Sequence, residues 1–382
     1  MIKETKKGIY IHIPFCVQKC FYCDFYSVSL KDEEILNDYL KCLIYELKTK
    51  SQDFSYTSIE SIYIGGGTPS LLSSDQLNMM LNTIKNYYKV DSNSEITMEA
   101  NPQSLDLTKL ISIKQAGVNR ISLGVQSFFS KELELLGRIH STKDIYNVVE
   151  NLHKTFDNFN IDLIYGLPNQ SLNDWIKNLK LAIDCSPKHI STYLLQLEPN
   201  TVLGKKVEKN ELQLLDQLFE SQMYYKCIEY LQSNSFKHYE ISNFACSGFE
   251  SKHNLIYWDA RYYLGFGAGA VSFIDNKRIM NETNYINYID QVNKTGRSKE
   301  QILETMTEDE LLVDAIILGL RKTKGINRSD FLNRFNQDIL VKYKKIIDKC
   351  IENNLLNYKD GYLFLTKEGY FLSNSVFCQF LG

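Results

Sequence analysis

The sequence has no apolar run long enough to cross a membrane and no large excess of charge of either sign. A membrane helix needs about 20 mainly apolar residues, whereas the most apolar stretch near the end, Leu311 to Leu320, carries Asp314 at its centre. The 43 basic and 46 acidic residues give a formal net charge of −3, which argues against bulk electrostatic binding to nucleic acid or to an acidic membrane surface. We therefore expect a soluble protein with no integral membrane span and no nucleic-acid partner.

The sequence also lacks an export signal and a regular disulfide framework. The apolar run from Gly8 to Phe15 contains His12 and leads directly into Cys16, without a small-residue cleavage site. The nine cysteines are an odd number, and only Cys16, Cys20 and Cys23 are clustered while the rest are scattered singly. We expect a cytoplasmic protein with a metal site at the three clustered cysteines.

The first half of the chain reads as repeated strands and helices. Six short runs rich in β-branched and aromatic residues occur at residues 8–13, 61–64, 95–99, 120–125, 160–165 and 189–197. Segments long enough for one or more helices separate these runs, and this alternation predicts a parallel sheet. Six units in a row favour a partial (β/α)6 barrel of the TIM type over an open doubly wound sheet, so the predicted fold class is α/β.

Chemically distinctive residues fall at the ends of these predicted strands. In a barrel, the residues just past the carboxyl ends of the strands gather at one mouth. The residues in question are the three cysteines, Gly65-Gly66-Gly67-Thr68, Glu99, Gln126, Asp162 and Glu198. Their placement predicts one functional site at that mouth.

The pattern changes in the second half of the chain. We expect a core barrel over residues 1–236, a connecting region over 237–306, and a C-terminal domain over 307–382. The last region opens with a capping box of Thr307 and Glu310, then predicts three helices and a hairpin around Asp360-Gly361, an α+β winged-helix-like domain. Because residues 301–382 hold 11 basic and 11 acidic side chains, a lid or packing role is favoured over DNA binding.

The spacing C-x3-C-x2-C supplies three thiolates on one short segment. A structural zinc site and an ordinary four-iron cluster each take four protein ligands, so three cysteines on a [4Fe–4S] cluster leave one iron open. The aromatic residues Phe15, Phe21, Tyr22, Phe25 and Tyr26 are expected to shield such a cluster from water. Two alternatives are core thiols on one helical face and a zinc site completed by His12.

Seven ordered blocks of sequence show a resemblance to a known family. They are Tyr10-Ile-His-Ile-Pro-Phe-Cys16 with the cysteine motif, 65–70 (GGGTPS), 99–102 (EANP), 117–120 (GVNR), 124–128 (GVQSF), 136–140 (LGRIH) and 162–168 (DLIYGLP). In this order they resemble the radical S-adenosylmethionine proteins of the oxygen-independent coproporphyrinogen III oxidase group. The resemblance covers nearly the whole chain.

The resemblance implies roles for individual residues. Cys16, Cys20 and Cys23 would hold a [4Fe–4S] cluster, with S-adenosylmethionine on its open iron. Residues implied to contact S-adenosylmethionine are Tyr10, Tyr22, Gly66, Gly67, Thr68, Glu99, Gln126, Arg138 and Asp162. Before residue 260 the chain has only two arginines, Arg120 and Arg138, which suggests a need for a planar two-pronged donor at those positions. The alternatives are structural: a tight turn for the glycines, solvated strand ends for the carboxylates, and packing or an ion pair for the arginines.

Within this group the sequence is similar to the branch of HemW-type haem chaperones. The oxidases carry a fourth cysteine two residues after the third, whereas this sequence has Phe25 there. The chaperone branch carries the motif H-N-x-x-Y-W, which His253, Tyr257 and Trp258 match. The resemblance implies that His253 is a ligand of haem iron and that the two aromatic residues cover the porphyrin. Without it, a lone histidine beside aromatic residues would be read as a hydrogen-bonded core residue.

Two functions follow from the resemblance, and both would use the same barrel mouth. In the first, the protein binds haem and transfers it to an acceptor protein, with the cluster and S-adenosylmethionine in a regulatory role. In the second, it is an enzyme that decarboxylates coproporphyrinogen III by radical chemistry, supplied with electrons by a flavodoxin or ferredoxin. Phe25 and the His253 motif favour the first, so the assignment as an enzyme stays open at this point.

Overall fold

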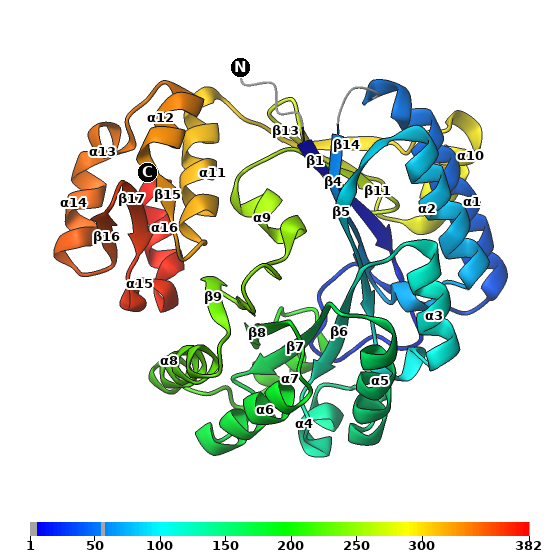
Figure 1. Cartoon of the computed structure of the whole chain (residues 1–382), viewed down its shortest axis with the longest axis horizontal. Helices are drawn as coiled ribbons and strands as arrows, with labels where there is room; N and C mark the ends of the chain where they lie inside the picture. The colour runs from blue at the N-terminus through cyan, green and yellow to red at the C-terminus, as the bar shows by residue number, and fades with distance from the viewer. Residues whose placement is uncertain (1–5, 55–57, 382) are drawn as a thin grey trace.

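The structure is a computed structural model that describes residues 6–54 and 58–381, and its main body is a curved sheet with helices on its outer face (Figure 1). The strands pair in the order β14-β13-β12-β11-β1-β4-β5-β6-β7-β8-β10-β9. The six central parallel strands are β1 (Lys6–Ile13), β4 (Ser58–Gly66), β5 (Lys89–Ala100), β6 (Arg120–Gln126), β7 (Phe159–Tyr165) and β8 (His189–Leu194). In this order β14 and β9 are the two edges, so the barrel stays open, and the predicted partial (β/α)6 barrel is confirmed.

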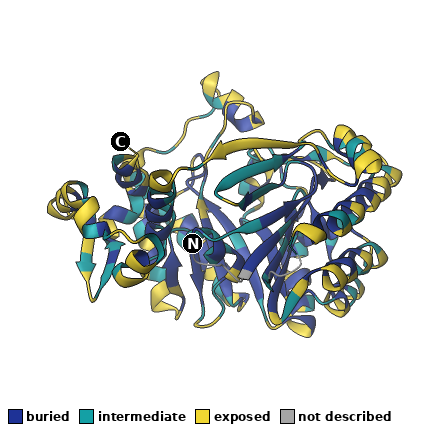
Figure 2. Ribbon diagram, turned by 90° about the horizontal axis from the view of Figure 1, so that it is seen from above, coloured by how far each residue is buried: buried dark blue, intermediate teal, exposed yellow. Residues whose placement is uncertain are grey.

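The strands form because apolar and polar residues alternate on them. In β1, Ile9, Ile11 and Ile13 are fully buried in the main core, while Tyr10 and His12 point to the other face. Successive side chains of a strand lie on opposite faces of a sheet. The apolar face packs under the helices, whose sheet-facing sides are buried and whose outer sides are exposed (Figure 2). The inner face of the barrel is therefore left to polar and aromatic side chains.

The helices that cover the barrel begin at the capping residues expected from the sequence. Ser73 and Gln76 form a capping box at the start of α2, and Ser171 caps α6. The helices of the barrel are α1 (Glu33–Lys50), α2 (Ser74–Tyr87), α3 (Leu107–Ala116), α4 (Ser130–Leu135), α5 (Thr142–Thr155), α6 (Leu172–Asp184), α7 (Val202–Glu208) and α8 (Gln217–Ser233). Caps of this kind satisfy backbone N–H groups that have no partner inside the helix.

The connecting region extends the sheet at both edges. Its elements are β9 (Lys237–Glu240), β10 (Asn243–Ala245), α9 (Lys252–Trp258), β11 (Tyr263–Phe266), β12 (Val271–Ile274), β13 (Lys277–Asn281), α10 (Tyr285–Thr295) and β14 (Glu300–Thr305). β10 pairs antiparallel with β8, while β11 pairs parallel with β1 on the other side. Leu264, Phe266 and Tyr288 belong to the same core as the barrel. The short helix α9 lies between the barrel strands and the C-terminal domain (Figure 1).

The C-terminal domain has its own hydrophobic core, which includes Ile316, Phe331 and Phe377. Its elements are α11 (Glu308–Leu320), β15 (Ile326–Asn327), α12 (Arg328–Phe335), α13 (Ile339–Lys342), α14 (Lys344–Glu352), β16 (Leu356–Lys359), β17 (Tyr362–Leu365), α15 (Lys367–Phe371) and α16 (Ser373–Phe380). The predicted capping box at Thr307 and the two-residue hairpin turn at Asp360-Gly361 are both present, and both turn residues have positive φ angles of 51° and 83°.

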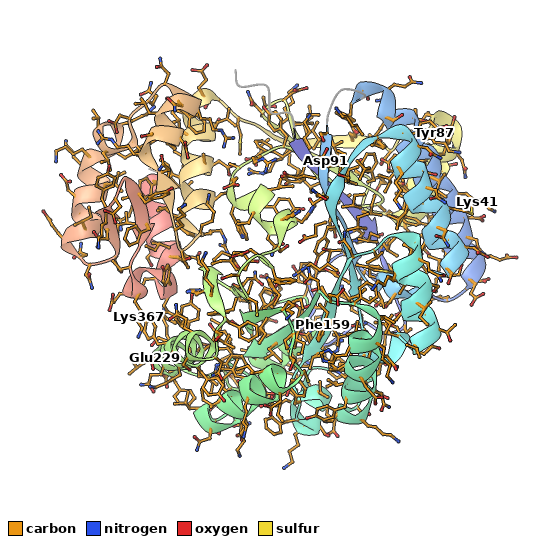
Figure 3. All side chains as sticks on the ribbon, viewed as in Figure 1. Lys41, Tyr87, Asp91, Phe159, Glu229 and Lys367 are labelled. Carbon is orange, nitrogen blue, oxygen red and sulfur yellow. The ribbon has the colours of Figure 1, made fainter. Side chains whose placement is uncertain are left out.

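The C-terminal domain also contacts the barrel at α8. Lys367 of α15 and Glu229 of α8 form an ion pair with an Nζ–Oε1 distance of 3.0 Å (Figure 3).

Two details differ from the sequence expectations. A short parallel pair, β2 (Phe15–Cys16) and β3 (Val28–Ser29), flanks the cysteine segment and was not expected. Strand β8 ends at Leu194 rather than Leu197, because the chain turns away three residues earlier. In the described part of the chain, no helix is both long and apolar enough to span a membrane.

Candidate functional site

The three clustered cysteines lie on a loop just past the carboxyl end of β1. Cys16 ends β2, and the N–H of Cys23 donates to the carbonyl of Cys20 across a turn at 3.3 Å. All three are free thiols. The guanidinium of Arg138 donates from Nη1 to Sγ of Cys20 at 3.3 Å. This contact ties the cysteine loop to the Arg138 segment.

Both alternative interpretations of the cysteines fit the structure poorly. Residues 16–23 form β2 and turns rather than a helix, so the cysteines are not core thiols on one helical face. The ring of His12 already has two partners: Nε2 donates to the carbonyl of Tyr26 at 2.9 Å, and Nδ1 accepts from the hydroxyl of Tyr10 at 2.9 Å. A zinc site completed by His12 would have to break one of these bonds.

The spacing of possible ligands also bears on the metal. Within residues 6–54 and 58–381, no three His, Cys, Asp or Glu side chains lie close enough to hold a single metal ion. A four-iron cluster is a larger body whose cysteines bind separate iron atoms, so it needs ligands that are farther apart than those of one ion. The donor set of three thiols on one loop fits the cluster better than it fits a lone ion.

The aromatic residues around this loop differ in how far their side chains are buried. Phe21 and Tyr22 pack against a small buried cluster that contains Leu136 and Leu203. The N–H of Phe21 donates to the carbonyl of Leu136 at 3.0 Å, which fixes the loop against the start of the Arg138 segment. The expectation that Phe25 shields the cluster is wrong, because this side chain is 74% exposed.

The glycine turn after β4 is held inside the protein by its own amides. The N–H of Gly67 donates to the carbonyl of Ile13 at 2.8 Å, and the N–H of Thr68 donates to that of Phe15 at 2.8 Å. A Cβ on Gly67 would lie 2.6 Å from the carbonyl oxygen of Phe15, and Gly66 has a φ of +113°. The glycines are thus required by the close approach of His12 in β1 and of Phe15 in β2.

Glu99 lies inside the barrel and is bonded to this turn. Its carboxylate accepts from the hydroxyl of Tyr63 at 2.7 Å and from the N–H of Gly66 at 3.1 Å. Burial raises the pKa of Glu99 to about 7, and the charge of Asp162 adds to this rise while the bond from Tyr63 opposes it. Glu99 is a half-buried, hydrogen-bonded side chain and not a solvated strand end. Once ionised, it can hold an ammonium group.

Asp162 faces the same interior from β7. Its carboxylate accepts from Nδ2 of Asn160 at 2.7 Å and from the hydroxyl of Ser122 at 3.2 Å. Burial raises the pKa of Asp162, and hydrogen bonds from Ser191 and Asn160 oppose the rise. The sequence analysis overlooked Asn160, although its position two residues before Asp162 places both side chains on one face of the strand.

Arg138 and Gln126 meet at the end of β6. Nη2 of Arg138 donates to Oδ1 of Asn101 and to the carbonyl of Gly124, both at 2.6 Å. Asn101 also donates to the hydroxyl of Thr68 at 3.1 Å, so it links the arginine to the glycine turn. Gln126 has a φ of +68°, an uncommon angle for a residue other than glycine. Among the described residues Arg138 forms no ion pair with a carboxylate, which suits the binding of a carboxylate from a ligand.

The histidine of the H-N-x-x-Y-W motif lies at the opposite end of the barrel from the cysteines. His253 is only 1% exposed, and Nδ1 is 2.8 Å from the hydroxyl of Ser61 while Nε2 is 2.9 Å from that of Tyr257. Its ring stacks on Tyr63 with the centroids 5.1 Å apart. Ser61 pairs with Gly8 near the start of β1, whereas Ile13 pairs with Gly66 at the carboxyl end, about 16 Å farther along the strand.

The expectation that His253 and the cysteines share one mouth is therefore wrong. The third residue of the motif is also separated from the other two. Tyr257 lies beside His253 inside the barrel, while Trp258 packs under the guanidinium of Arg321, whose Cζ is 4.4 Å from the ring centroid. The structure thus brings together the cysteines and the residues expected to bind S-adenosylmethionine, and it places the residues expected to bind haem elsewhere.

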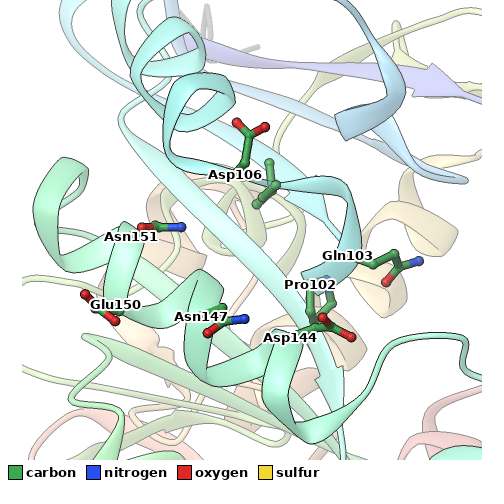
Figure 4. A pocket seen from close by; sticks show the side chains of 8 residues that line it. Pro102, Gln103, Asp106, Asp144, Asn147, Glu150 and Asn151 are labelled. Carbon is green, nitrogen blue, oxygen red and sulfur yellow. The ribbon is translucent and has the colours of Figure 1, made fainter.

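A surface hollow between residues 102–106, which precede α3, and helix α5 lies outside this arrangement (Figure 4). Its lining includes Pro102, Gln103, Asp106, Asp144 and Glu150. Asp106 caps α3 and Asp144 completes the capping box of α5. Because both carboxylates already stabilise helix ends, the hollow is explained by the packing of the helices.

Comparisons with known proteins identify the family. Sequence profiles of the radical SAM superfamily and of the HemN C-terminal domain match residues 10–182 and 306–372. The radical SAM enzyme coproporphyrinogen III oxidase (HemN) from Escherichia coli has the same fold, with a TM-score of 0.85 and 20% identity over 99% of this chain and 90% of that chain.

Curated relatives match at higher identity. Heme chaperone HemW from Bacillus subtilis (strain 168) is 36% identical over 98% of this chain and 99% of the relative. Heme chaperone HemW from Escherichia coli (strain K12) is 39% identical over 72% of this chain and 73% of the relative. The mitochondrial radical S-adenosyl methionine domain-containing protein 1 of Bos taurus is 33% identical over 83% of this chain and 68% of the relative. This chain therefore belongs to the heme chaperone HemW family of radical SAM proteins.

Proposed function

We propose that this protein is a haem chaperone that binds a [4Fe–4S] cluster, S-adenosylmethionine and haem, and that it passes haem to an acceptor protein. The observation that carries the proposal is the match of nearly the whole chain to relatives named heme chaperone. The intact H-N-x-x-Y-W motif on α9 supports it. Phe25, at the position where the oxidases carry a fourth cysteine, is exposed and cannot ligate iron.

The cysteine loop and the inner face of the barrel would hold the cluster and S-adenosylmethionine. When bound, the cluster supplies an electron and an open iron for the amine and carboxylate of the ligand. Glu99 would accept from the N–H groups of that amine, and Arg138 would bind the carboxylate. Asp162 would accept from the ribose hydroxyls, and the backbone at Gly66, Gly67 and Thr68 would lie along the methionyl part. Tyr10, Tyr22 and Gln126 would line the same space.

The region around α9 would bind haem after a local rearrangement. Imidazole is a common axial ligand of haem iron, but both ring nitrogens of His253 have partners in this structure. Close to the other end of α9, Nε1 of Trp258 and Nε of Arg321 are buried and lack a hydrogen-bond partner among the described residues. These two donors suit the carboxylates of a porphyrin. Haem ligation by His253 would therefore require its ring to give up the bond to Ser61 or the bond to Tyr257.

The remaining parts of the proposal concern partners and compartment. The acceptor of haem is a protein that this chain does not identify. A flavodoxin or ferredoxin would serve as reductant if the cluster is reduced during the cycle. A cytoplasmic location agrees with the free thiols, because a thiolate-bound cluster is maintained where thiols stay reduced.

One set of anaerobic preparations tests the proposal. Iron, sulfide and haem are measured on the wild type, on Cys20→Ser with Cys246→Ser as its control, and on His253→Ala with His153→Ala as its control. We expect Cys20→Ser alone to lose the cluster spectrum and His253→Ala alone to lose the haem spectrum or affinity. Haem binding that is unchanged in His253→Ala would remove the proposed ligand. Catalytic formation of protoporphyrinogen from coproporphyrinogen would instead support the oxidase.

A further inference from the structure

One asparagine links two of the three clustered cysteines through a bridge of hydrogen-bonded side chains. Asn101 directly follows β5, and its Oδ1 accepts from Nη2 of Arg138 at 2.6 Å. Nη1 of the same guanidinium donates to Sγ of Cys20 at 3.3 Å. On its other side, Nδ2 of Asn101 donates to the hydroxyl of Thr68 at 3.1 Å. The Thr68–Asn101–Arg138 bridge thus joins the glycine turn after β4 to the segment after α4.

The hydroxyl of Thr68 continues this bridge to Cys16. The N–H of Thr68 donates to the carbonyl of Phe15, the residue before Cys16, at 2.8 Å. Burial raises the pKa of the Cys16 thiol, and hydrogen bonds with the hydroxyls of Thr68 and Ser27 oppose this rise. Because Oγ1 of Thr68 accepts from Asn101, its own proton is left to donate to the sulfur. The bridge therefore runs between the sulfur atoms of two cysteines.

The orientation of the Asn101 amide is fixed by its partners. A guanidinium can only donate, so the amide atom that faces Arg138 is the oxygen, and the amide nitrogen faces Thr68. The carbonyl of Asn101 accepts from the N–H of Ser104 at 3.0 Å, which anchors its backbone. A Cβ on Gly124 would lie 3.3 Å from Oδ1 of Asn101 and 3.4 Å from Nη2 of Arg138, so a side chain there would crowd both groups.

Asn101 also fixes the direction in which Arg138 presents its charge. Both N–H groups of Nη2 are in use, because one donates to Asn101 and the other to the carbonyl of Gly124, each at 2.6 Å. A guanidinium has five N–H donors, so the remaining three, on Nη1 and Nε, are left for Cys20 and for a ligand. Within residues 6–54 and 58–381 no carboxylate forms an ion pair with Arg138. Its positive charge therefore stays beside the sulfur without a neutralising side chain.

We infer that Asn101 is a positioning residue for the cluster, and that it raises the reduction potential of the cluster by holding Arg138 against Cys20 and Thr68 against Cys16. This inference rests on the cluster of the function proposed above. Reduction moves one electron from a low-potential reductant such as dithionite to the cluster, which then carries one more negative charge. A positive group and hydrogen bonds at the sulfur atoms stabilise that added charge, and hydrogen bonds to the sulfurs help to set cluster potentials.

Two substitutions of Asn101 separate the parts of this effect. Asn101→Leu keeps the approximate size of the side chain and removes both bonds, so the guanidinium of Arg138 can turn away from Cys20. Asn101→Asp keeps the shape and pairs its own charge with Arg138. Because a carboxylate can only accept, Asn101→Asp also turns the hydroxyl of Thr68 away from Cys16. Asn101→Asp therefore removes more of the stabilisation than Asn101→Leu does.

The experiment is an anaerobic redox titration of the reconstituted full-length protein with dithionite, without S-adenosylmethionine, in which electron-spin resonance follows the reduced cluster. The control is Asn119→Leu. Asn119 donates to the carbonyl of Ser94 and accepts from the N–H of Ile96, both at 2.8 Å, but it lies just before β6, at the end of the barrel remote from the cysteines. Iron and sulfide are measured on every preparation, so that potentials are compared at equal cluster content.

We expect the control to keep the wild-type potential and Asn101→Leu to have a lower one. Loss of a hydrogen bond to a charged group shifts an equilibrium about tenfold or more, and tenfold in a one-electron reduction is about 59 mV. The shift in Asn101→Asp should be larger still.

Three results would overturn the inference and leave the chaperone function intact. They are wild-type or higher potentials in both Asn101 variants, an equal shift in Asn119→Leu, and folded Asn101 variants that assemble no cluster, which would give Asn101 a role in assembly instead. A wild type that shows no cluster signal after reconstitution would overturn both the inference and the proposed function.

Discussion

Replacement of Glu99 by glutamine is expected to weaken ligand binding and stabilise the fold at the same time. The ionised carboxylate is proposed to accept from the amine N–H groups of S-adenosylmethionine, and a hydrogen bond to a charged group contributes about 1.5–3 kcal/mol. Glu99→Gln keeps the size of the side chain but removes the charge. We expect the Kd for S-adenosylmethionine at pH 8 to rise about tenfold or more.

The stability effect follows from the pKa of Glu99, which burial raises from 4.5 to about 7. Below pH 4.5 the carboxyl is neutral in both the folded and the unfolded chain. Between pH 4.5 and 7 the unfolded chain loses the proton first, so the free energy of unfolding falls as the pH rises. Above pH 7 the full loss is present. A difference of one in pKa corresponds to about 1.4 kcal/mol, so the loss reaches at most about 3 kcal/mol, and water inside the open barrel reduces it.

Two measurements check this reasoning. Urea unfolding of the protein without ligands should be measured at pH 4.5 and pH 8. We expect the free energy of unfolding of Glu99→Gln to exceed that of the wild type only at pH 8. Calorimetric titration with S-adenosylmethionine between pH 6 and 8 should show affinity rising with pH more steeply in the wild type than in the variant, because the amine of the ligand titrates equally in both. Parallel pH profiles for the two proteins would refute the assignment of Glu99.

Three other substitutions test separate parts of the structure. Lys50→Met should lower the free energy of unfolding by about 3–5 kcal/mol, because it leaves the fully buried carboxylate of Glu46 without its cation. A loss below about 1 kcal/mol in urea titrations would contradict this expectation. Gly67→Ala should reduce iron incorporation, since its Cβ would lie 2.6 Å from a carbonyl oxygen beside the cysteine loop. The control Gly361→Ala has open space around its Cβ, so it should keep full iron content and lose only about 1 kcal/mol of stability. Arg138→Lys should weaken S-adenosylmethionine binding about tenfold, because an ammonium group cannot reach Cys20 and a ligand carboxylate together; unchanged affinity would remove Arg138 from the site.

The barrel was predictable because its signals are local and regular. Each of the six expected runs forms a strand, and the capping residues at Ser73 and Thr307 start helices as predicted. The hairpin at Asp360-Gly361 also follows from its two turn residues. The gathering of Glu99 and Asp162 near the cysteine loop follows from the topology alone, because the carboxyl ends of parallel strands meet at one edge.

The position of His253 was not predictable in the same way. Its motif shows which residue types occur together, but the end of the barrel that α9 enters depends on contacts with Gly8 and Ser61, far away in the sequence. A Cβ on Gly8 would lie 3.1 Å from the His253 ring, so this glycine permits the close approach.

The internal position of His253 gives the open barrel a second role. A barrel that only held S-adenosylmethionine could fill the end remote from the cysteines with apolar side chains, and such a core would be more stable than one made of polar side chains. Here that space contains His253, the carboxylate of Glu95 and the hydroxyls of Ser61 and Tyr257. Ser61 and Glu95 bond to α9 from β4 and β5, whereas the bond between Tyr257 and His253 lies within α9. Such a network holds α9 in one place only while all its bonds are made. Apolar burial adds to this retention, because Ile256 on the same helix is fully buried, so release of His253 from the barrel would cost both polar and apolar contacts.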